Sequence, residues 1–547
     1  MTKKVQCWIR KYDTVLFFVV IVALQLIVAL FYMNSKQHMH VDEFLCYEGA
    51  HNVFLHGFGE QGYYLYSNEE WFNTWHTKEE FMGLFEVQGD ESILNHSPME
   101  LKSNLKIKNI YYILLNIVES FQLDPTMTKW SGFVLNSIIF VMHQIVLNLI
   151  GWEIFRDKRK ALLPMIIYGF SAGAISLIIY IRFYVLKSLM GLLIAYIHLK
   201  LLEWRNVWGI IAAFGVTIAA VQLIWYFQPH IVLYAASAVF VFMIVCCIKK
   251  DYKFLLKYVC VGCIGAVALV LFVPNVLARL ANNASSDIGV QTISNFLHRS
   301  LKWYVIASKV SLIKVVSHVA GGVYTIAAVG VMLAVIWYIQ NRKEKVKWKK
   351  PEYLNLKAFY MICTSICFFL VFCKMTHAAA YRYMSCIYPG FCVGIAILLE
   401  WVMESCRLRR RGAVVCTVVS IGLFFGYTRN YVDEIYPEAS EMWEEAAGYQ
   451  DADNLFIGTE EDHHQYYRDG YLTNDGTRIY KVNWEDIENV DFSFLDELEG
   501  EGFLCWLPIG WGDEATQRRM EWILVRTDYK EFERAFTTYN SNVYYVY

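Results

Sequence analysis

The residues best placed for chemistry are two adjacent carboxylates, Asp42 and Glu43, in the run His40-Val41-Asp42-Glu43-Phe44. They follow a long apolar segment by about two helical turns, so we expect them near the point where that segment leaves a membrane. A carboxylate held at this boundary can accept a proton from an acceptor hydroxyl while a lipid phosphate lies beside it. The alternative is that these carboxylates are simply solvated acidic residues in the first turn of a helix, without a catalytic role.

Positively charged residues gather near the same predicted side of the membrane. Arg182 and Lys187 flank the third and fourth predicted spans, and Lys374, His377 and Arg382 flank the ninth and tenth. Guanidinium forks match phosphate oxygens, so several cations here would hold a lipid-linked phosphate. Extension of these side chains to lipid headgroups, without a catalytic role, is the alternative.

The elements that position these residues are membrane helices. The chain has 547 residues, and 56% of them are hydrophobic, which is more than a soluble protein of this length can bury. Apolar runs long enough to cross a bilayer recur along most of the sequence. The sequence predicts an all-α polytopic membrane bundle of about eleven spans, at residues 15–33, 130–153, 161–181, 183–203, 207–227, 229–248, 254–277, 319–340, 355–375, 384–404 and 412–427.

The positive charges predict the orientation, because short loops rich in Lys and Arg stay in the cytoplasm. Basic clusters occur in alternate loops, which places the N-terminus inside and the segments from 34 to 129 and from about 428 onward outside. The clusters are the N-terminal residues, Arg156–Lys160, Lys249–Lys257, Arg342–Lys350 and Arg407–Arg411.

The predicted outer loop, residues 34–129, is far longer than a connection between two spans requires. It is rich in aromatic residues, and its apolar stretch Ile110–Phe121 is too short to span a bilayer. We expect helices that lie in the outer interface of the membrane. A loop of this length usually carries function, and a purely structural lid is the alternative.

The C-terminal part, residues 431–547, is predicted to be an extracytoplasmic α/β domain. From residue 428 onward the chain holds 27 Asp and Glu against nine Lys and Arg, which argues against a nucleic-acid partner. Short β-rich runs (Leu455–Gly458, Phe503–Pro508, Val543–Tyr547) alternate with helical patterns (Glu438–Tyr449, Asp513–Arg526). The acidic and histidine run 460–464 is a poor metal cluster, because adjacent ligands rarely point at one ion, and we assign no metal ligands.

Three short motifs resemble a known family. They are the Asp-Glu after the first helix, Ile181-Arg182-Phe183-Tyr184-Val185-Leu186 at the start of a helix, and Tyr381-Arg382-Tyr383 followed by Pro389. Together with Ile110-Tyr111-Tyr112-Ile113-Leu114-Leu115, they are similar to bacterial protein-mannosyltransferase-like and aminoarabinose-transferase-like (family 39-like) enzymes of the GT-C glycosyltransferase fold. The similarity covers residues 1–430, the predicted membrane domain.

The resemblance implies an inverting transfer of a sugar from a polyprenyl-phosphate donor to an acceptor outside a bacterial plasma membrane. Asp42 matches the family's catalytic base, and Glu43 would support it or help to bind the acceptor or an ion. Arg182 and Arg382 match positions that face the lipid phosphate. Tyr184 and Tyr383 would line the site, and Lys187 and His377 would join them in binding the substrate. The implied partners are the lipid-linked sugar, membrane lipids and an acceptor that is a protein, a lipid or a glycan.

One motif departs from the family pattern. Ile107-Lys108-Asn109 replaces the family's His-Pro-Pro, and Leu105 or Lys106 stands where an acidic residue is usual. The resemblance therefore implies no cofactor with certainty and leaves a divalent metal open. Asp90, Glu91 or Glu100 would be the substitutes for the missing carboxylate.

Two other classes of function share this predicted topology. A flippase or transporter of lipid-linked saccharides would commonly show paired helix breaks near mid-membrane, whereas the prolines here lie close to the predicted helix ends. A catalytically inactive scaffold is favoured over a transporter by the altered His-Pro-Pro segment. The sequence does not name the sugar, the length of the carrier lipid, the acceptor or the oligomeric state.

Overall fold

A computed structural model of the chain divides into two compact units, each described by itself below. The helical unit comprises Met1–Phe31, Asn136–Ile179 and Phe183–Asp433, and the mixed unit comprises Tyr32–Leu135, Tyr180–Arg182 and Glu434–Tyr547. The structure describes residues 3–51, 53, 71–87, 89, 91–97, 100, 110–121, 129–224, 230–272, 287–343, 353–375, 381–405, 431–459, 463–490, 492–498 and 502–547.

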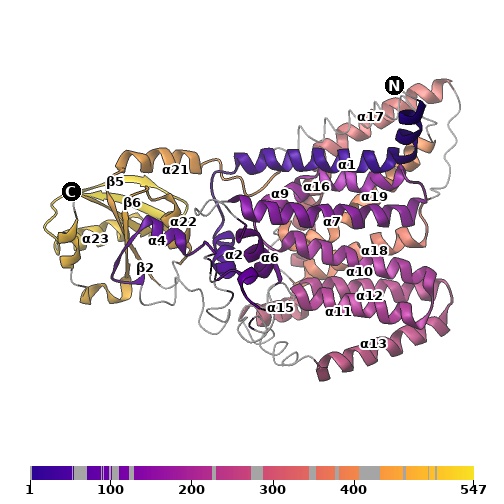
Figure 1. The fold of residues 1–547 in the computed structure, drawn as a ribbon, viewed down its shortest axis with the longest axis horizontal. Helices are drawn as coiled ribbons and strands as arrows, with labels where there is room; N and C mark the ends of the chain where they lie inside the picture. Colours follow the sequence, from indigo (N-terminus) through magenta and orange to yellow (C-terminus); the bar gives the residue numbers. More distant parts are fainter. Residues whose placement is uncertain are drawn as a thin grey trace. The chain divides into compact units, whose positions relative to one another are not determined.

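Long helices make up the helical unit (Figure 1). Neighbouring helices in this unit pack in pairs such as α10 with α11 and α12 with α18. The helices are α1 (Lys3–Ser35), α7 (Lys129–Phe155), α8 (Leu163–Gly169), α9 (Ala172–Ile179), α10 (Tyr184–Trp204), α11 (Val207–Ile224), α12 (His230–Ile248), α13 (Tyr252–Phe272), α15 (Asp287–His298), α16 (Leu301–Ala320), α17 (Gly322–Lys343), α18 (Leu356–Met375) and α19 (Tyr388–Ser405), with the 3-10 turns η3 (Lys160–Leu162) and η4 (Tyr381–Ile387).

Among the described residues, nine helices are long and apolar enough to cross a membrane, or ten when one bent pair is counted as a span. The chain is therefore a multi-pass membrane protein. Ten of the eleven predicted ranges coincide with helices, and the eleventh, 412–427, lies outside the described residues. The predicted single span 161–181 is instead broken into two helices, Lys160–Gly169 and Ala172–Ile179, which meet at a bend of 59°.

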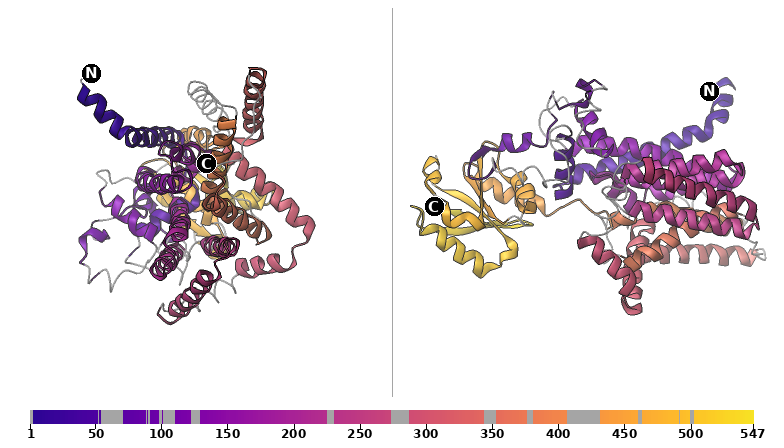
Figure 2. Two further views of the ribbon diagram at one scale, coloured as in Figure 1. Left: turned by 90° about the vertical axis from the view of Figure 1, so that its right-hand side faces the viewer. Right: turned by 90° about the horizontal axis from the view of Figure 1, so that it is seen from below.

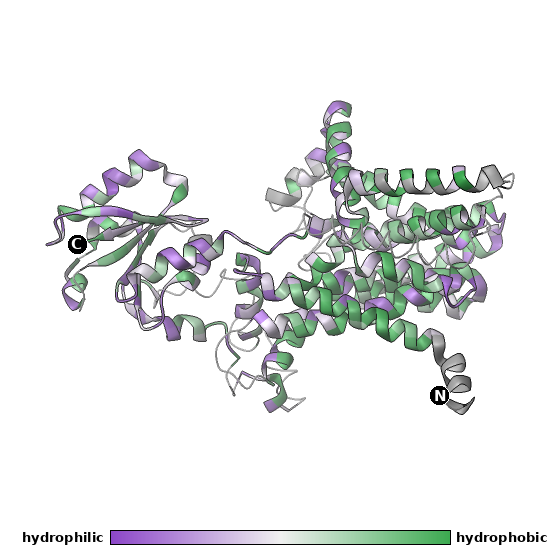
Figure 3. Ribbon diagram, turned by 90° about the horizontal axis from the view of Figure 1, so that it is seen from above, coloured by the Kyte–Doolittle hydropathy of each residue, from purple (hydrophilic) through white to green (hydrophobic). Residues whose placement is uncertain are grey.

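The outward faces of these helices are apolar, as lipid contact requires. Side chains such as Phe31 on α1 and Leu256, Ile264 and Leu271 on α13 are exposed. Figure 3 shows hydrophobic residues along the lengths of these helices. Exposure of so much apolar surface is unfavourable in water and favourable in hydrocarbon.

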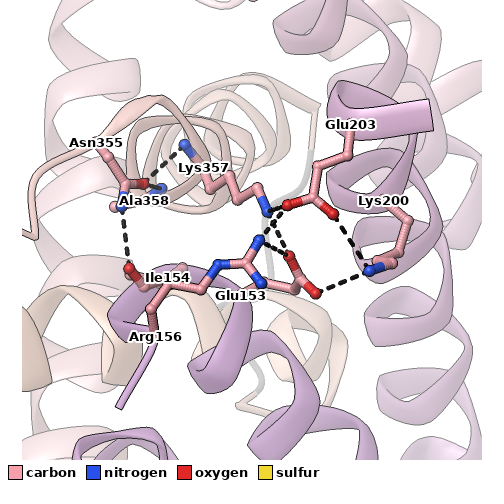
Figure 4. Close-up of polar contacts among 8 residues, drawn as sticks. All are labelled: Glu153, Ile154, Arg156, Lys200, Glu203, Asn355, Lys357 and Ala358. Carbon is pink, nitrogen blue, oxygen red and sulfur yellow. Dashed lines mark hydrogen bonds and ion pairs between the residues drawn. The ribbon is translucent and has the colours of Figure 1, made fainter. Parts of the chain in front are cut away.

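A network of charges joins the ends of α7, α10 and α18 (Figure 4). Glu153 is buried on α7, and its carboxylate accepts from Lys200 Nζ at 2.9 Å and from Arg156 Nη2 at 2.9 Å. Lys357 at the start of α18 pairs with Glu153 and also donates to Glu203 at 2.6 Å. Arg156, the first residue of the basic cluster that predicts a cytoplasmic loop, thus belongs to a network that joins three helices, while its side of the membrane stays a prediction.

A six-stranded sheet is the core of the mixed unit, with strand order β1-β3-β2-β4-β6-β5. The central strands β3, β2 and β4 are parallel, and the other pairs are antiparallel. Its elements are α2 (Val41–His51), β1 (Trp75–Thr77), α4 (Lys78–Gly83), α6 (Ile110–Glu119), α21 (Ala439–Ala446), β2 (Asp453–Gly458), α22 (His463–Leu472), β3 (Arg478–Asn483), β4 (Phe503–Pro508), α23 (Asp513–Leu524), β5 (Phe532–Thr537) and β6 (Ser541–Val546).

The predicted strands and helices of the C-terminal part are present. Strand β4 is buried along its whole length, which explains why its sequence is a continuous apolar run rather than an alternating one. The predicted short helix at Ile110 is also present as α6, while its position in a membrane interface stays a prediction.

One strand of the sheet comes from the predicted outer loop rather than from the C-terminal part. Strand β1 pairs with β3, and the next residue, Lys78, donates to the carbonyl oxygens of Gly470 at 2.5 Å and Tyr471 at 2.7 Å. These are carbonyls of the last turn of α22, which a helix leaves without partners of its own. The loop thus belongs to the same compact unit as the C-terminal residues, and a separate domain at 431–547 stays a prediction.

Candidate active site

Asp42 lies in the first turn of α2, within the mixed unit, and three side chains surround its carboxylate. Arg182 Nη1 lies 3.0 Å from Oδ1, and the hydroxyl of Tyr180 donates to Oδ2 at 2.7 Å. His40 Nδ1 is 3.7 Å from Oδ2 and accepts from the Asp42 amide at 3.0 Å. The Asp42 side chain is 23% exposed, so its carboxylate is oriented by neighbours and still open to another molecule.

Glu43 has the opposite environment, because its side chain is fully buried. One carboxylate oxygen accepts from Lys36 Nζ at 2.5 Å and from the Ile181 amide at 2.7 Å, and the other accepts from the His40 amide at 2.7 Å. These three donors come from the end of α1, the start of α2 and the segment 180–182. Glu43 therefore holds together the backbone on both sides of Asp42.

The segment 180–182 carries both side chains that bind Asp42. It makes a tight turn, in which the Arg182 amide donates to the Tyr180 carbonyl at 2.7 Å. Ile181, at its centre, packs against Gly132 so closely that a Cβ at Gly132 would lie 2.1 Å from Ile181 Cγ2. Arg182 Nη1 also donates to the backbone oxygen of Asp42 at 2.6 Å.

A second group of predicted residues lies within the helical unit. Lys187 is buried on α10, and its ammonium donates to the carbonyl oxygens of Arg382 at 3.0 Å and Tyr383 at 3.3 Å in η4. The rings of Tyr184 and Tyr383 meet edge to face with centroids 6.2 Å apart, and the Arg382 guanidinium lies 5.7 Å from the Tyr383 ring. The structure thus brings these four residues together and gives Lys187 a role in holding η4.

Other predicted residues have different surroundings. His377, Asp90 and the Ile107-Lys108-Asn109 motif lie outside the described residues. Glu91 pairs with His51 at 2.7 Å, and Glu100 accepts from the Ser97 amide at 2.7 Å. Among the residues the structure describes, no group of three or more His, Cys, Asp or Glu is arranged to hold a metal ion.

Sequence reasoning missed three residues of these two groups. Tyr180 and Lys36 bind the Asp42 and Glu43 carboxylates, and His230 stacks on Tyr383 with ring centroids 5.1 Å apart. Tyr180 lies two residues before the predicted Arg182, so its position immediately before the motif that starts at Ile181 was the one signal available. Lys36 lies seven residues before Glu43, outside the motif, and His230 lies far from any motif, so only the fold shows their contacts.

Comparisons with known proteins agree with this architecture. No family model matches the chain, and no curated protein matches its sequence. Two solved structures match over 98% of both chains: ArnT from Cupriavidus metallidurans bound to undecaprenyl phosphate, at 11% identity with a TM-score of 0.51, and the same protein in the apo state, at 12% identity with a TM-score of 0.50. At this identity the likeness establishes the fold. The chain therefore has the fold of an ArnT-like, GT-C-type membrane protein, with a membrane helix bundle and a C-terminal α/β region.

Proposed function

We propose that this protein is a glycosyltransferase that moves a sugar from a polyprenyl-phosphate donor to an acceptor at the outer face of the membrane. The observation that carries the proposal is the contrast between the two neighbouring carboxylates. Asp42 is oriented by Tyr180 and Arg182 and remains partly exposed, whereas Glu43 is fully buried. A general base needs a fixed orientation together with access to the hydroxyl that it deprotonates.

In this reaction Asp42 accepts the proton of an acceptor hydroxyl as the oxygen attacks the anomeric carbon of the sugar. The bond between that carbon and the phosphate oxygen breaks, and the lipid phosphate leaves with the bonding electrons. Arg182 binds the phosphate, because an anionic leaving group gains most from guanidinium donors as its charge develops. Arg382 is assigned to binding of the donor. Tyr184, Tyr383 and His377 contribute to binding of the donor.

Lys187 and Glu43 act as positioning residues. The ammonium of Lys187 is engaged by the backbone of η4, which carries Arg382 and Tyr383. Glu43 holds the backbone around Asp42 through three hydrogen bonds. The solved structure of ArnT bound to undecaprenyl phosphate supports a carrier lipid of the polyprenyl-phosphate class for this chain.

The test is transfer of labelled sugar from polyprenyl-phosphate donors to membrane acceptors in proteoliposomes, with the parent protein and Asp42→Asn at matched amounts. Loss of a general base lowers the rate by roughly 100-fold or more. Binding of the donor should persist, because the amide keeps the size of the carboxylate. Equal turnover by both proteins would reject Asp42 as the base. Donor binding with no turnover by the parent protein would favour a scaffold or a flippase.

A further inference from the structure

Helix α16 differs from the other candidate spans in its direction. By length and composition it could cross a membrane. Yet it runs across the long helices of the helical unit, as the left view of Figure 2 (α16 in red) shows. Its last residue is followed by Gly321 and Gly322, which have φ values of 68° and 86°. Two consecutive residues with positive φ end one helix and allow α17 to start in a new direction.

The two faces of α16 are different. Ser311, Val315, His318 and Val319 form a buried stripe. This side of α16 packs against α9, α18, α19 and η4. Lys302 and Lys309 are seven residues, or two turns, apart and lie on the opposite, exposed face. The helix contains three lysines and no acidic residue.

The N-terminal half of α16 exposes apolar side chains alongside these lysines. Leu301 is 76% exposed and Trp303 is 63% exposed, and Val305, Ile306 and Val310 are also exposed. This surface is unfavourable in water, and the lysines are unfavourable deep in hydrocarbon. The boundary between headgroups and acyl chains satisfies both kinds of side chain.

Both ends of α16 are fixed to the bundle. Just before it, Arg299 Nη1 donates to the Cys373 carbonyl at 2.6 Å, and Lys374 Nζ donates to the Arg299 carbonyl at 2.6 Å. Near its end, His318 Nε2 lies 2.8 Å from Asp433 Oδ2, and its ring stacks on Tyr381 with centroids 5.0 Å apart. These contacts keep the helix crosswise, so its direction is a property of the fold.

We propose that α16 lies in the plane of the membrane interface and binds anionic phospholipid headgroups through Lys302 and Lys309. Charge complementarity identifies the partner, because the exposed face carries only positive charges among apolar residues that enter the acyl region. A zwitterionic headgroup offers no net charge to these lysines, whereas phosphatidylglycerol does. This inference does not depend on the proposed transferase activity.

The experiment uses the full chain in nanodiscs with two photoactivatable forms of phosphatidylglycerol and of phosphatidylcholine. One form carries its reactive group near the headgroup and the other at the end of the acyl chain. Cross-linked peptides are mapped by mass spectrometry for the parent protein and for Lys302→Gln/Lys309→Gln. Arg518→Gln/Lys530→Gln, which removes two positive charges from the mixed unit, is the matched control.

We expect the headgroup form of phosphatidylglycerol to label residues 301–314, with less labelling by phosphatidylcholine. The lysine variant should lose about fivefold in labelling per lysine removed, and the control should lose none. Equal labelling by both lipids, or unchanged labelling of the lysine variant, would overturn the proposal. Labelling of the middle of α16 mainly by the chain-end form would show a spanning helix and would also overturn it.

Discussion

Asp42 and Glu43 are neighbours in the chain, yet their carboxylates have opposite surroundings. The reason is the first turn of α2, where consecutive side chains point in directions about 100° apart. The Glu43 side chain reaches the Lys36 ammonium and the Ile181 amide. The Asp42 side chain reaches Tyr180 and Arg182. At the residue scale, the sequence predicted the pair but not which member is buried.

Tyr180→Phe should slow sugar transfer by roughly tenfold and alter its dependence on pH. The Tyr180 hydroxyl donates to Asp42 and so stabilises the ionised carboxylate. Without this hydrogen bond the ionised carboxylate is less stabilised, and the acidic limb of the profile of kcat/KM against pH moves to higher pH. Tyr529→Phe, a change in the same unit away from Asp42, serves as the control. An unshifted profile would show that Tyr180 has no influence on the base.

Asp469→Asn should make the stability of the mixed unit less dependent on pH. Burial raises the pKa of the Asp469 carboxyl to about 7, although Ser541 donates to it at 2.5 Å. The folded state therefore favours the protonated form, whereas the unfolded chain ionises near pH ~4. The stability that this group contributes is present below that pH and is lost as the pH rises through about 7. Thermal unfolding from pH 4 to 8 should show a smaller decline in Tm for the variant, and parallel declines would contradict this prediction.

At the scale of elements, close approach of the Ile181 side chain to the backbone of α7 decides where the segment 180–182 lies. Gly132, near the start of α7, allows contact with Ile181 that any larger residue would obstruct. The charge network of Figure 4 likewise fixes the positions of α7, α10 and α18. It does so through ion pairs between side chains, whereas Gly132 does so by having no side chain.

Gly132→Ala should lower sugar transfer at least tenfold while the protein still inserts into the membrane. The new methyl group would meet Ile181 and displace the segment that holds Tyr180 and Arg182. Gly215→Ala on α11 is the matched control, because a Cβ there meets nothing within 4 Å. Turnover in proteoliposomes at equal protein amounts measures the effect. Similar activity of the two variants would mean that the segment accommodates the methyl group.

Glu153→Ala should destabilise the helical unit by roughly 1–3 kcal/mol, because three cations lose their buried partner and keep only Glu203. Glu514→Ala, which removes an exposed pair with Arg518 in the mixed unit, should cause almost no change. Thermal unfolding in the same nanodiscs compares the two variants. Equal Tm values would indicate that the network does not stabilise the bundle.

Helix positions were predictable because a span that contacts lipid requires a long run of apolar residues in the sequence. The break between Gly169 and Ala172 was not, because the bend has no proline at its centre and the apolar run continues on both sides of it. Helix α16 was missed among the predicted spans, which have no range between 277 and 319. Its direction was also hidden, since a helix in the interface and a spanning helix can share length and composition. Of the candidate site, the motif residues were found from sequence, whereas Lys36, Tyr180 and His230 depend on tertiary packing.

At the scale of the whole molecule, neither unit is continuous in sequence. The mixed unit takes the predicted outer loop, three residues between α9 and α10, and the C-terminal residues. Asp42, Tyr180 and Arg182 are thus parts of the same unit as the sheet. We expect changes in the C-terminal residues to affect Asp42 through this shared folding.

A fragment of residues 431–547 should be poorly soluble and should melt less cooperatively than the same fragment joined to residues 71–87. Without β1 the edge of β3 is unpaired, and without Lys78 the end of α22 lacks its buried cap. Circular dichroism and size-exclusion chromatography of the two fragments provide the comparison. Equal stability would establish that the C-terminal region folds alone.

The contact between Lys78 and α22 has a consequence for biosynthesis, because its partners lie 392 residues apart in the chain. At typical rates of synthesis, roughly 20–80 s separate the appearance of the two segments at the ribosome. Throughout that interval the nascent loop holds a strand without a neighbour and a lysine without its acceptors. A chain that stops before Gly470 therefore never supplies the acceptors of Lys78, and its strand β1 never pairs with β3.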